Sequence, residues 1–227
     1  MTPEKWAAVD RYYGDLLVAP DAALDAALAS IAASGLPPIN VSPLQGKLLM
    51  LLARMCGARN ILEIGTLAAY STIWLARALP PGGRLITLES EEKHARIART
   101  NLARAGLDGA VELVLGRALD SLPRLAAAGR GPFDLIFIDA DKQSTTEYFN
   151  WSLNLSHPGS VIIVDNVVRS GNIVDPASTD VSVQGVRRFN EAMAKEPRVS
   201  ATAIQTVGGK GYDGLTILLV NGNSAAA

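Results

Sequence analysis

The sequence lacks several residues on which common protein functions depend. Its 227 residues include a single cysteine, Cys56, which excludes an internal disulfide and a cysteine-based zinc cluster. The two histidines, His94 in an exposed, charged helical turn and His157 in the turn "SHPG", stand alone, whereas metal-binding histidines usually come in spaced pairs. We therefore expect neither histidine to be a metal ligand or a general base.

The chain also lacks long apolar runs and an excess of charge of one sign. No run approaches the ~20 residues that a membrane-spanning helix needs. The net charge is −1, and no segment concentrates the lysine and arginine that binding to a nucleic acid or a membrane surface would require. The N-terminus mixes acids and bases without an apolar stretch, so we expect no signal peptide and a cytoplasmic protein. A small molecule is thus the expected partner.

Length and composition predict one globular domain. With 48% hydrophobic and 19% charged residues, residues 1–227 are ordinary for a folded, single-domain chain. We divide this domain into N-terminal helices (1–59), an α/β core (60–221) and a frayed tail (222–227).

Capping residues define two of the N-terminal helices. One helix within residues 20–35 begins after Asp21, whose side chain is suited to cap it. The other, within residues 42–57, begins with Ser42 and Gln45, which have the spacing of a capping box.

The core alternates short apolar runs with helical stretches such as Glu91 to Ala105, for which Ser90 is the expected cap. This alternation predicts a doubly wound α/β fold with a parallel sheet. After a helix over 181–195, two late strands, 199–207 and 213–221, would pair as a hairpin through "GGKGYDG" and complete a mostly parallel seven-stranded sheet. The five earlier strands are expected at 60–65, 83–90, 110–116, 133–140 and 160–166.

Polar residues at the carboxyl ends of the strands are the candidates for ligand binding, because open parallel sheets bind ligands there. Gly65 follows the first strand, lets a ligand approach the backbone, and precedes a helix that Ser71 is expected to cap. The dinucleotide fingerprint G-x-G-x-x-G is absent, which disfavours a dehydrogenase. Glu89 ends the second strand, where an acid accepts the hydroxyls of a ribose or caps the next helix. The pattern indicates an adenosine ligand without a pyrophosphate.

Oxygen-bearing side chains follow the fourth and fifth strands. A right-handed crossover places these strands side by side, so Asp139, Asp165 and Asn166 should converge. Carboxylate and amide oxygens without thiolate or imidazole suit a hard octahedral ion such as Mg²⁺. The alternative is that the aspartates cap helices and Asn166 is a turn residue. Lys142 beside the cluster favours the metal site.

Several motifs together resemble the cation-dependent O-methyltransferases that use S-adenosylmethionine, the group of caffeoyl-CoA and catechol O-methyltransferases and their bacterial relatives. The resemblance covers about residues 36–220, and its most specific element is "DADK" paired with "DN" one crossover later. It implies a Rossmann-like class I methyltransferase fold with extra N-terminal helices, and a homodimer. The motifs are "NILEIGTLAAYSTIWLA", "GRLITLE", "GRALDSLP", "FDLIFIDADK" and "VIIVDNVVRSGNIVDP".

The resemblance implies a role for each residue at a matching position. Lys142 would be the base, with Asp139 as the second catalytic residue. The divalent cation, Mg²⁺ or else Mn²⁺ or Ca²⁺, would be held by Asp139, Asp165 and Asn166. The cofactor S-adenosylmethionine would be bound by Val41, Glu63, Gly65, Ser71, Glu89, Ala118, Asp139 and Asp141.

A phenolic molecule with neighbouring hydroxyls, such as a catechol, is the acceptor that the resemblance implies. Two adjacent oxygens can chelate Mg²⁺, which makes the phenol more acidic and aligns the attacking oxygen with the methyl group. Positioning and charge then supply most of the acceleration. Lys142 would take the phenolic proton; its alternative role is a salt bridge to Asp139 or Asp141.

Two departures from the plant enzymes of this family concern the acceptor. Arg169 stands where they usually carry a tryptophan, and the segment "GGKGYDG", which contains Lys210, is longer than their turn. We expect Arg169 and Lys210 to lie at the pocket mouth and to favour an acceptor that carries a carboxylate or a phosphate.

Three other functions stay open at this point. "FIDADKQS" also resembles the Asp-x-Asp start of haloacid-dehalogenase-like phosphatases, with Asp139 as nucleophile and Asp141 as acid. That motif normally opens its fold, whereas three strand-helix units precede it here. A non-catalytic binder of an adenosyl ligand would not need the metal cluster. A metal-independent O-methyltransferase is the mildest alternative.

Overall fold

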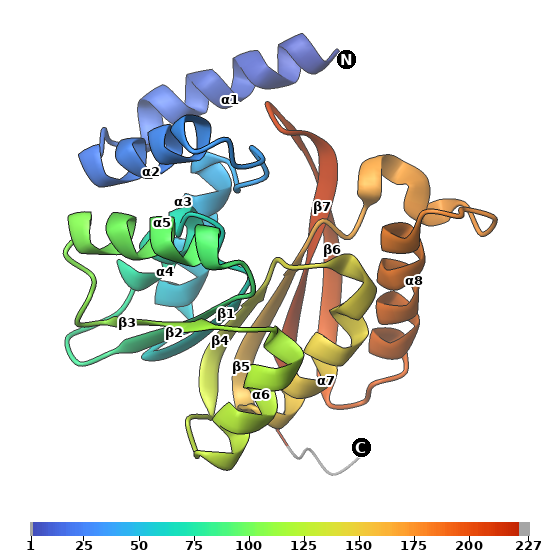
Figure 1. Cartoon of the computed structure of the whole chain (residues 1–227). Coiled ribbons are helices and arrows are strands. Elements are labelled where there is room, and N and C mark those ends of the chain that lie inside the picture. The colour runs from blue at the N-terminus through green and yellow to red at the C-terminus, as the bar shows by residue number, and fades with distance from the viewer. Residues whose placement is uncertain (1, 223–227) are drawn as a thin grey trace.

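A seven-stranded mixed sheet forms the centre of the computed structural model, which describes residues 2–222 (Figure 1). The strands lie in the order β3-β2-β1-β4-β5-β7-β6. β1 to β5 are parallel, whereas β7 is antiparallel to both β5 and β6. The predicted doubly wound, mostly parallel fold is therefore confirmed. The strands are β1 (Asn60–Ile64), β2 (Arg84–Glu89), β3 (Val111–Leu115), β4 (Phe133–Ile138), β5 (Ser156–Asp165), β6 (Val199–Gly208) and β7 (Gly211–Val220).

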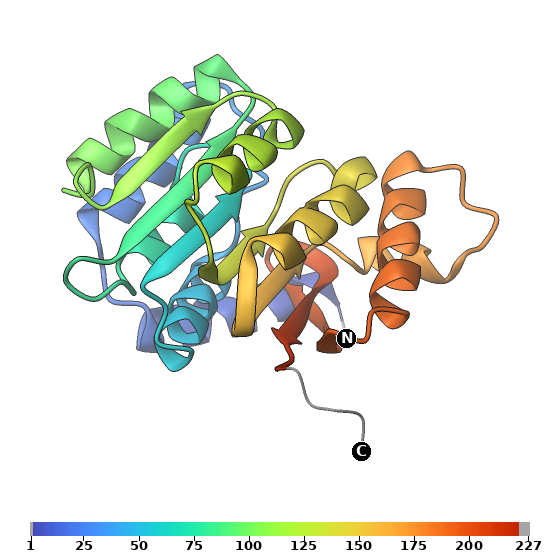
Figure 2. The same ribbon diagram turned by 90° about the horizontal axis from the view of Figure 1, so that it is seen from below.

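Helices cover both faces of the sheet (Figures 1 and 2). Side chains of α2, α3, α4 and α5 share one buried cluster with strand residues such as Ile61 and Leu135. Side chains of α6, α7 and α8 share a second cluster, on the other face, with residues such as Leu62 and Ile136. The helices are α1 (Pro3–Leu17), α2 (Ala22–Ala33), α3 (Pro43–Met55), α4 (Tyr70–Ala76), α5 (Glu92–Arg104), α6 (Ala118–Ala127), α7 (Thr145–Asn154) and α8 (Val181–Ala194), with 3₁₀ segments η1 (Lys142–Ser144) and η2 (Arg169–Val174).

The alternation of side chains along a strand explains this two-sided core. Successive residues point to opposite faces, so Ile61 and Leu62 enter different clusters although they are neighbours in β1. Because both faces are covered, the parallel strands consist of almost continuous apolar runs. The ends of the strands are then the places where charged side chains can gather.

Two predicted helix caps are confirmed. The Asp21 carboxylate accepts hydrogen bonds from two backbone amides of α2, and the Ser42 hydroxyl accepts one from the Gln45 amide in α3. The capping box at Ser42 is incomplete, however, because the side chain of Gln45 does not turn back to the helix start. It donates a hydrogen bond to Asp165 instead.

Two other predicted caps are wrong. α5 begins one residue later than expected, with Glu91 rather than Ser90 as its N-cap. Ser71 lies inside α4, whose N-cap is Ala69 in a left-handed conformation with φ of 64°. In both cases the turn that leads into the helix is set by contacts of the preceding strand end, which the local sequence does not reveal.

The last two strands form the expected hairpin, although both strands are longer than predicted. β6 and β7 stay paired as far as Gly208 and Gly211, so their connection shortens to Gly209 and Lys210. The Gly209 amide donates a hydrogen bond of 2.7 Å to the Asp10 carboxylate, which joins the hairpin tip to α1 (Figure 1).

Three further predictions concern the rest of the chain. His157 lies near the start of β5 instead of in a turn, and its Nε2 is 2.9 Å from Oδ1 of Asp134, at the amino ends of the strands. Within residues 2–222, no helix combines the length and the apolar character needed to cross a membrane. Residues 223–227 of the predicted frayed tail lie outside the described residues.

Candidate active site

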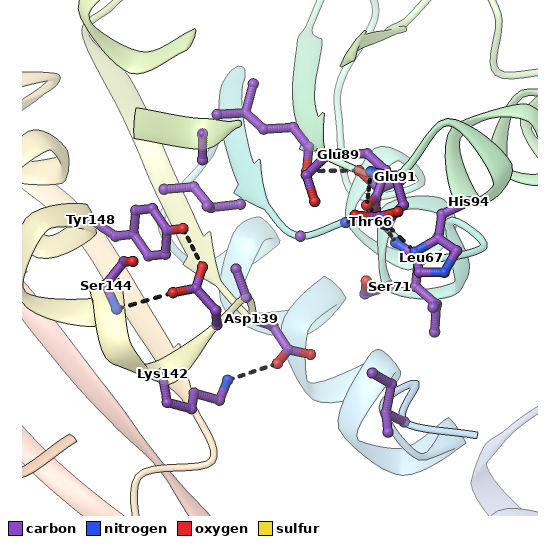
Figure 3. A pocket seen from close by; sticks show the side chains of 18 of the residues that line it. Thr66, Leu67, Ser71, Glu89, Glu91, His94, Asp139, Lys142, Ser144 and Tyr148 are labelled. Atoms are coloured by element: carbon purple, nitrogen blue, oxygen red, sulfur yellow. Dashed lines mark hydrogen bonds and ion pairs between the residues drawn. The ribbon is translucent and has the colours of Figure 1, made fainter. Parts of the chain in front are cut away.

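A cavity of about 690 Å³ opens at the carboxyl ends of the parallel strands (Figure 3). Its walls come from the loops after β1, β2, β3, β4 and β5, and from the segment that precedes α3. Figure 3 shows Glu89, Glu91 and His94 on one side of it, and Asp139 and Lys142 on the other. The cavity is therefore where an open α/β sheet is expected to bind its ligand.

The loop after β1 approaches β4 so closely that a side chain does not fit at its start. Gly65 has φ of 102°, and a Cβ atom there would lie 2.1 Å from the carbonyl oxygen of Asp139. The Asp139 amide in turn donates a hydrogen bond of 2.9 Å to the Ile64 carbonyl. This close approach fixes the floor of the cavity relative to Asp139.

Glu63 lies beneath this loop rather than in the cavity wall. Its buried carboxylate accepts hydrogen bonds from the hydroxyls of Ser71 (2.6 Å), Thr72 (2.5 Å) and Thr87 (2.6 Å). Burial raises the pKa of Glu63 to about 7, although the three hydroxyls act in the opposite direction. Glu63 therefore holds the first turn of α4 against the sheet and positions Ser71, which does line the cavity.

Glu89 joins the loops after β1 and β2 at one end of the cavity. Its Oε2 accepts hydrogen bonds from the backbone amides of Thr66 (3.3 Å) and Leu67 (2.7 Å). Its Oε1 accepts one from the Glu91 amide (3.0 Å), at the start of the next helix. His94 Nδ1 lies 3.5 Å from Oε1, and His94 lines the cavity with a half-buried side chain, although the turn around it is exposed as expected.

A charged cluster occupies the ends of β4 and β5. The ammonium nitrogen of Lys142 lies 3.0 Å from Oδ1 of Asp139, and the Lys142 side chain is only 9% exposed. Burial, together with the neighbouring Asp139 carboxylate, raises the pKa of Asp165. Neither aspartate caps a helix, so the capping alternative is wrong for both. Asn166 follows Asp165 with φ of 59° and lines the cavity.

The Asp165 carboxylate is held from two sides. Its Oδ1 accepts a hydrogen bond of 2.8 Å from the Asn166 amide, and its Oδ2 accepts one of 2.7 Å from the side-chain amide of Gln45. Gln45 lies in the first turn of α3, 120 residues earlier in the chain. The carboxylate is thereby oriented by a helix of the N-terminal layer.

Asp141 points toward the segment that follows it. Its Oδ2 accepts a hydrogen bond of 3.1 Å from the Ser144 amide, and its Oδ1 accepts one of 2.5 Å from the Tyr148 hydroxyl. Partial burial acts to raise the pKa of Asp141, but these hydrogen bonds outweigh it and the pKa lies below its usual value. Asp141 therefore gives the cavity wall a stable negative charge at neutral pH.

Nearly the whole chain is similar to known O-methyltransferases. The family model described as O-methyltransferase matches residues 22–219. A catechol O-methyltransferase from Niastella koreensis is 54% identical over 220 residues, which are 97% of this chain and 100% of that protein.

Two solved structures of O-methyltransferases are similar to this chain in both sequence and fold. The O-methyltransferase from Bacillus cereus, in complex with SAH, is 57% identical with a TM-score of 0.96, over 97% of this chain and 100% of that one. The O-methyltransferase TomG from Streptomyces achromogenes is involved in tomaymycin synthesis and was solved with SAM. It is 54% identical with a TM-score of 0.95, over 98% of this chain and 100% of that one.

The chain belongs to the O-methyltransferase family. The resemblance inferred from the sequence motifs is thereby confirmed, and the enzyme class with it. The match does not favour the phosphatase alternative, in which Asp139 and Asp141 would act on a phosphate.

Most of the residues predicted for the site line the cavity of this methyltransferase. Two do not: Glu63 lies under the β1 loop, and Asp165 lies behind the wall with 4% of its surface exposed. The predicted residues that line the cavity are Val41, Gly65, Ser71, Glu89, Ala118, Asp139, Asp141, Lys142 and Asn166.

The two cations expected at the pocket mouth of the methyltransferase differ in their placement. Arg169 lines the cavity. Lys210 does not, because its ammonium nitrogen donates a hydrogen bond of 2.8 Å to the Pro38 carbonyl. Partial burial lowers the pKa of Lys210.

Three residues of the methyltransferase site were missed from the sequence. Gln45 was assigned to a local cap, and Tyr148 carries no signal that links it to Asp141. Gly185 of α8 was also missed: a Cβ atom there would lie 2.1 Å from the carbonyl oxygen of Lys142, so the glycine lets α8 pack directly on the η1 backbone. All three contacts join segments that no periodicity or motif connects.

Proposed function

We propose that this chain transfers the methyl group of S-adenosylmethionine to a hydroxyl of a small, catechol-like or other vicinal-dihydroxy aromatic acceptor, with the help of a divalent cation. The observation that carries the proposal is the pairing of Asp139 and Lys142, which follow β4, with Asp165 at the end of β5 and Asn166 directly after it. The similar proteins include a catechol O-methyltransferase, which supports the same acceptor class.

The other side of the cavity suits the cofactor. Glu89 would accept the ribose hydroxyls, Ala118 would contact the adenine, and the Asp141 carboxylate would face the cationic part of the molecule. When bound, S-adenosylmethionine supplies an electrophilic methyl group on a positively charged sulfur. A cavity wall with several carboxylates favours such a cation.

The donor set at the ends of β4 and β5 fits a hard divalent cation. Asp139, Asp165 and Asn166 would hold it through two carboxylates and one amide, which are the ligands that Mg²⁺, Mn²⁺ and Ca²⁺ accept. Across residues 2–222, no group of three or more histidine, cysteine, aspartate or glutamate side chains offers another metal site. When bound, the cation would make a chelated phenol more acidic.

Lys142, in its neutral amine form, would accept the proton of the acceptor hydroxyl. Its side chain is largely shielded from water, and its nitrogen lies beside Asp139, a proposed ligand of the cation. Removal of a proton by a positioned side chain contributes about 10²- to 10⁴-fold to a rate. The alternative role of Lys142 is the ion pair with Asp139. A variant that keeps the positive charge at this position distinguishes the role of base from the role of ion-pair partner.

A homodimer and a cytoplasmic location stay predictions. The exposed apolar side chains of Tyr12, Leu16 and Leu17 on α1 support association through the N-terminal helices. Light scattering after size-exclusion chromatography would measure the mass of the particle in solution.

The proposed function is tested by calorimetric titration of S-adenosylmethionine, followed by methyl transfer to caffeic acid with Mg²⁺ and then with a chelator. We expect cofactor binding and turnover that the chelator abolishes. Turnover that persists in the chelator would favour the metal-independent alternative. Absence of cofactor binding would overturn the proposal.

A further inference from the structure

Arg169 is a cation in the cavity wall whose guanidinium has a buried, unpaired nitrogen. It lies three residues after Asn166, a proposed metal ligand, and lines the same cavity. Its Nε atom makes no hydrogen bond with any residue from 2 to 222, and no carboxylate in that range lies within ion-pair distance. A buried charged donor without a partner is costly. Because the side chain lines the cavity, an anionic group bound there would give the guanidinium the charge partner that it lacks.

The position of Arg169 depends on an unusual backbone turn. Arg169, Ser170 and Gly171 have φ angles of 54°, 56° and 86°, in the left-handed region that residues other than glycine rarely adopt. Asp213 of β7 supports this turn, because its Oδ1 accepts hydrogen bonds of 3.0 Å from the amides of both Val168 and Arg169. Asp213 thus fixes the backbone from which the Arg169 side chain leaves.

Two neighbouring lysines already have partners of their own. Lys142 forms its ion pair, and Lys210 donates to a backbone carbonyl outside the cavity. Arg117 lines the cavity, but it is exposed and lies at the start of α6, on the side proposed for the adenine. Arg169 is thus the cation available to a group on the acceptor.

We propose that Arg169 recognises a carboxylate on the acceptor, so that the enzyme favours catechols with an acid group over neutral catechols. This inference rests on the proposed function and specifies its acceptor class. A guanidinium offers paired N–H donors whose spacing matches the two oxygens of a carboxylate. Lys210, which the sequence also placed at the pocket mouth, has no part in this recognition.

The test compares two acceptors that differ only in that charge: caffeate and its methyl ester. The readout is the ratio of kcat/KM for caffeate to kcat/KM for the ester, measured for the wild type and for Arg169→Gln and Arg169→Lys. Arg124→Gln is the matched control, because Arg124 is exposed on α6, carries the same charge and does not line the cavity.

We expect the wild type to favour caffeate, and Arg169→Gln to lower the ratio by about 10- to 100-fold, mainly through KM for caffeate, as loss of a charged hydrogen bond does. Arg169→Lys should recover part of the preference, and Arg124→Gln should keep it. A wild-type ratio near one, or a ratio that Arg169→Gln leaves unchanged, would overturn the inference.

A failure of the proposed function would look different from a failure of this inference. If the wild type methylates neither acceptor, calorimetric binding of caffeate and of the ester replaces turnover as the readout. Tighter binding of caffeate that Arg169→Gln abolishes would then still support carboxylate recognition. Equal binding of both molecules by wild type and variant would refute it.

Discussion

Gln45 in α3 donates a hydrogen bond of 2.7 Å to Asp165 at the end of β5, and so joins the N-terminal helical layer to the proposed metal site. The other oxygen of the same carboxylate accepts the Asn166 amide, so both oxygens are oriented by the protein. A ligand that is held in this way needs little rearrangement when a cation binds.

Replacing Gln45 with alanine should therefore weaken binding of the divalent cation. Outer contacts of a metal ligand typically contribute 10- to 100-fold to affinity, and we expect a loss of about tenfold. Titration of Mn²⁺ followed by electron paramagnetic resonance measures this affinity without turnover. Gln184→Ala is the control, since Gln184 is exposed and bonds to the Ser178 carbonyl. Equal Mn²⁺ affinity in the Gln45 variant and the wild type would contradict the prediction.

Lys142→Arg should separate the two roles of Lys142. The arginine keeps the positive charge beside Asp139 but does not release a proton in proteins, so it cannot serve as a base. If Lys142 is the base, kcat should fall by about 10²- to 10⁴-fold while the affinity for S-adenosylmethionine stays the same. Pre-steady-state kinetics and cofactor titration measure the two quantities. Nearly full activity of the variant would show that the charge alone is required.

Gly65→Ala should destabilise the fold more than an ordinary substitution of a glycine with positive φ. Its new Cβ atom would meet the Asp139 carbonyl oxygen at 2.1 Å, and its φ of 102° is unfavourable for alanine. We expect a loss of roughly 3 kcal/mol or more in the free energy of unfolding.

Gly106→Ala is the control for the clash at Gly65. Gly106 has φ of 68°, but a Cβ atom there has no neighbour within 4 Å. We expect a loss of about 1 kcal/mol from backbone strain alone. Urea denaturation of both variants measures the difference, and equal losses would mean that the loop after β1 can move away from β4.

Glu63 should make the stability of the protein depend on pH. Its pKa rises from 4.5 to about 7 on folding, so its protonated form is favoured in the folded state. The stability that this preference contributes is present below pH 4.5 and is lost as the pH rises through 7, by about 3 kcal/mol.

Glu63→Gln tests this dependence, because glutamine stays neutral and keeps a similar shape. Relative to the wild type, the variant should gain about 2.5 kcal/mol in the free energy of unfolding between pH 5 and pH 8. Denaturation curves at several pH values measure that gain. Parallel pH profiles for the two proteins would rule out titration of Glu63 in this range.

Much of this architecture follows from local patterns. The apolar runs from Asn60 to Asp165 predict strands that are buried on both faces, and their alternation with helices predicts the parallel sheet. Caps such as Asp21 are local too, because a side chain bonds to amides two or three residues away. Strand ends rich in acids were enough to locate the cavity, because parallel strands end at the same edge of a sheet.

Predictions from local patterns were wrong where a side chain could form a hydrogen bond either with a nearby backbone group or with a distant carboxylate. Ser71 was expected to cap a helix, but its hydroxyl donates to Glu63 inside the core. Gln45 had the spacing of a capping box, but its amide reaches Asp165. In each case a buried carboxylate must be hydrogen-bonded, and that requirement outweighs a cap that water could replace.

The sequence by itself thus determined the fold class, the family motifs and the edge of the sheet where the chemistry must lie. All of these depend on residues close together in the chain or on the periodicity of buried strands. Tertiary structure alone decided which side of the cavity each polar group occupies, that Arg169 enters the cavity while Lys210 does not, and that α3 orients Asp165. These features depend on contacts between segments far apart in sequence, and such contacts exist only once the chain has packed.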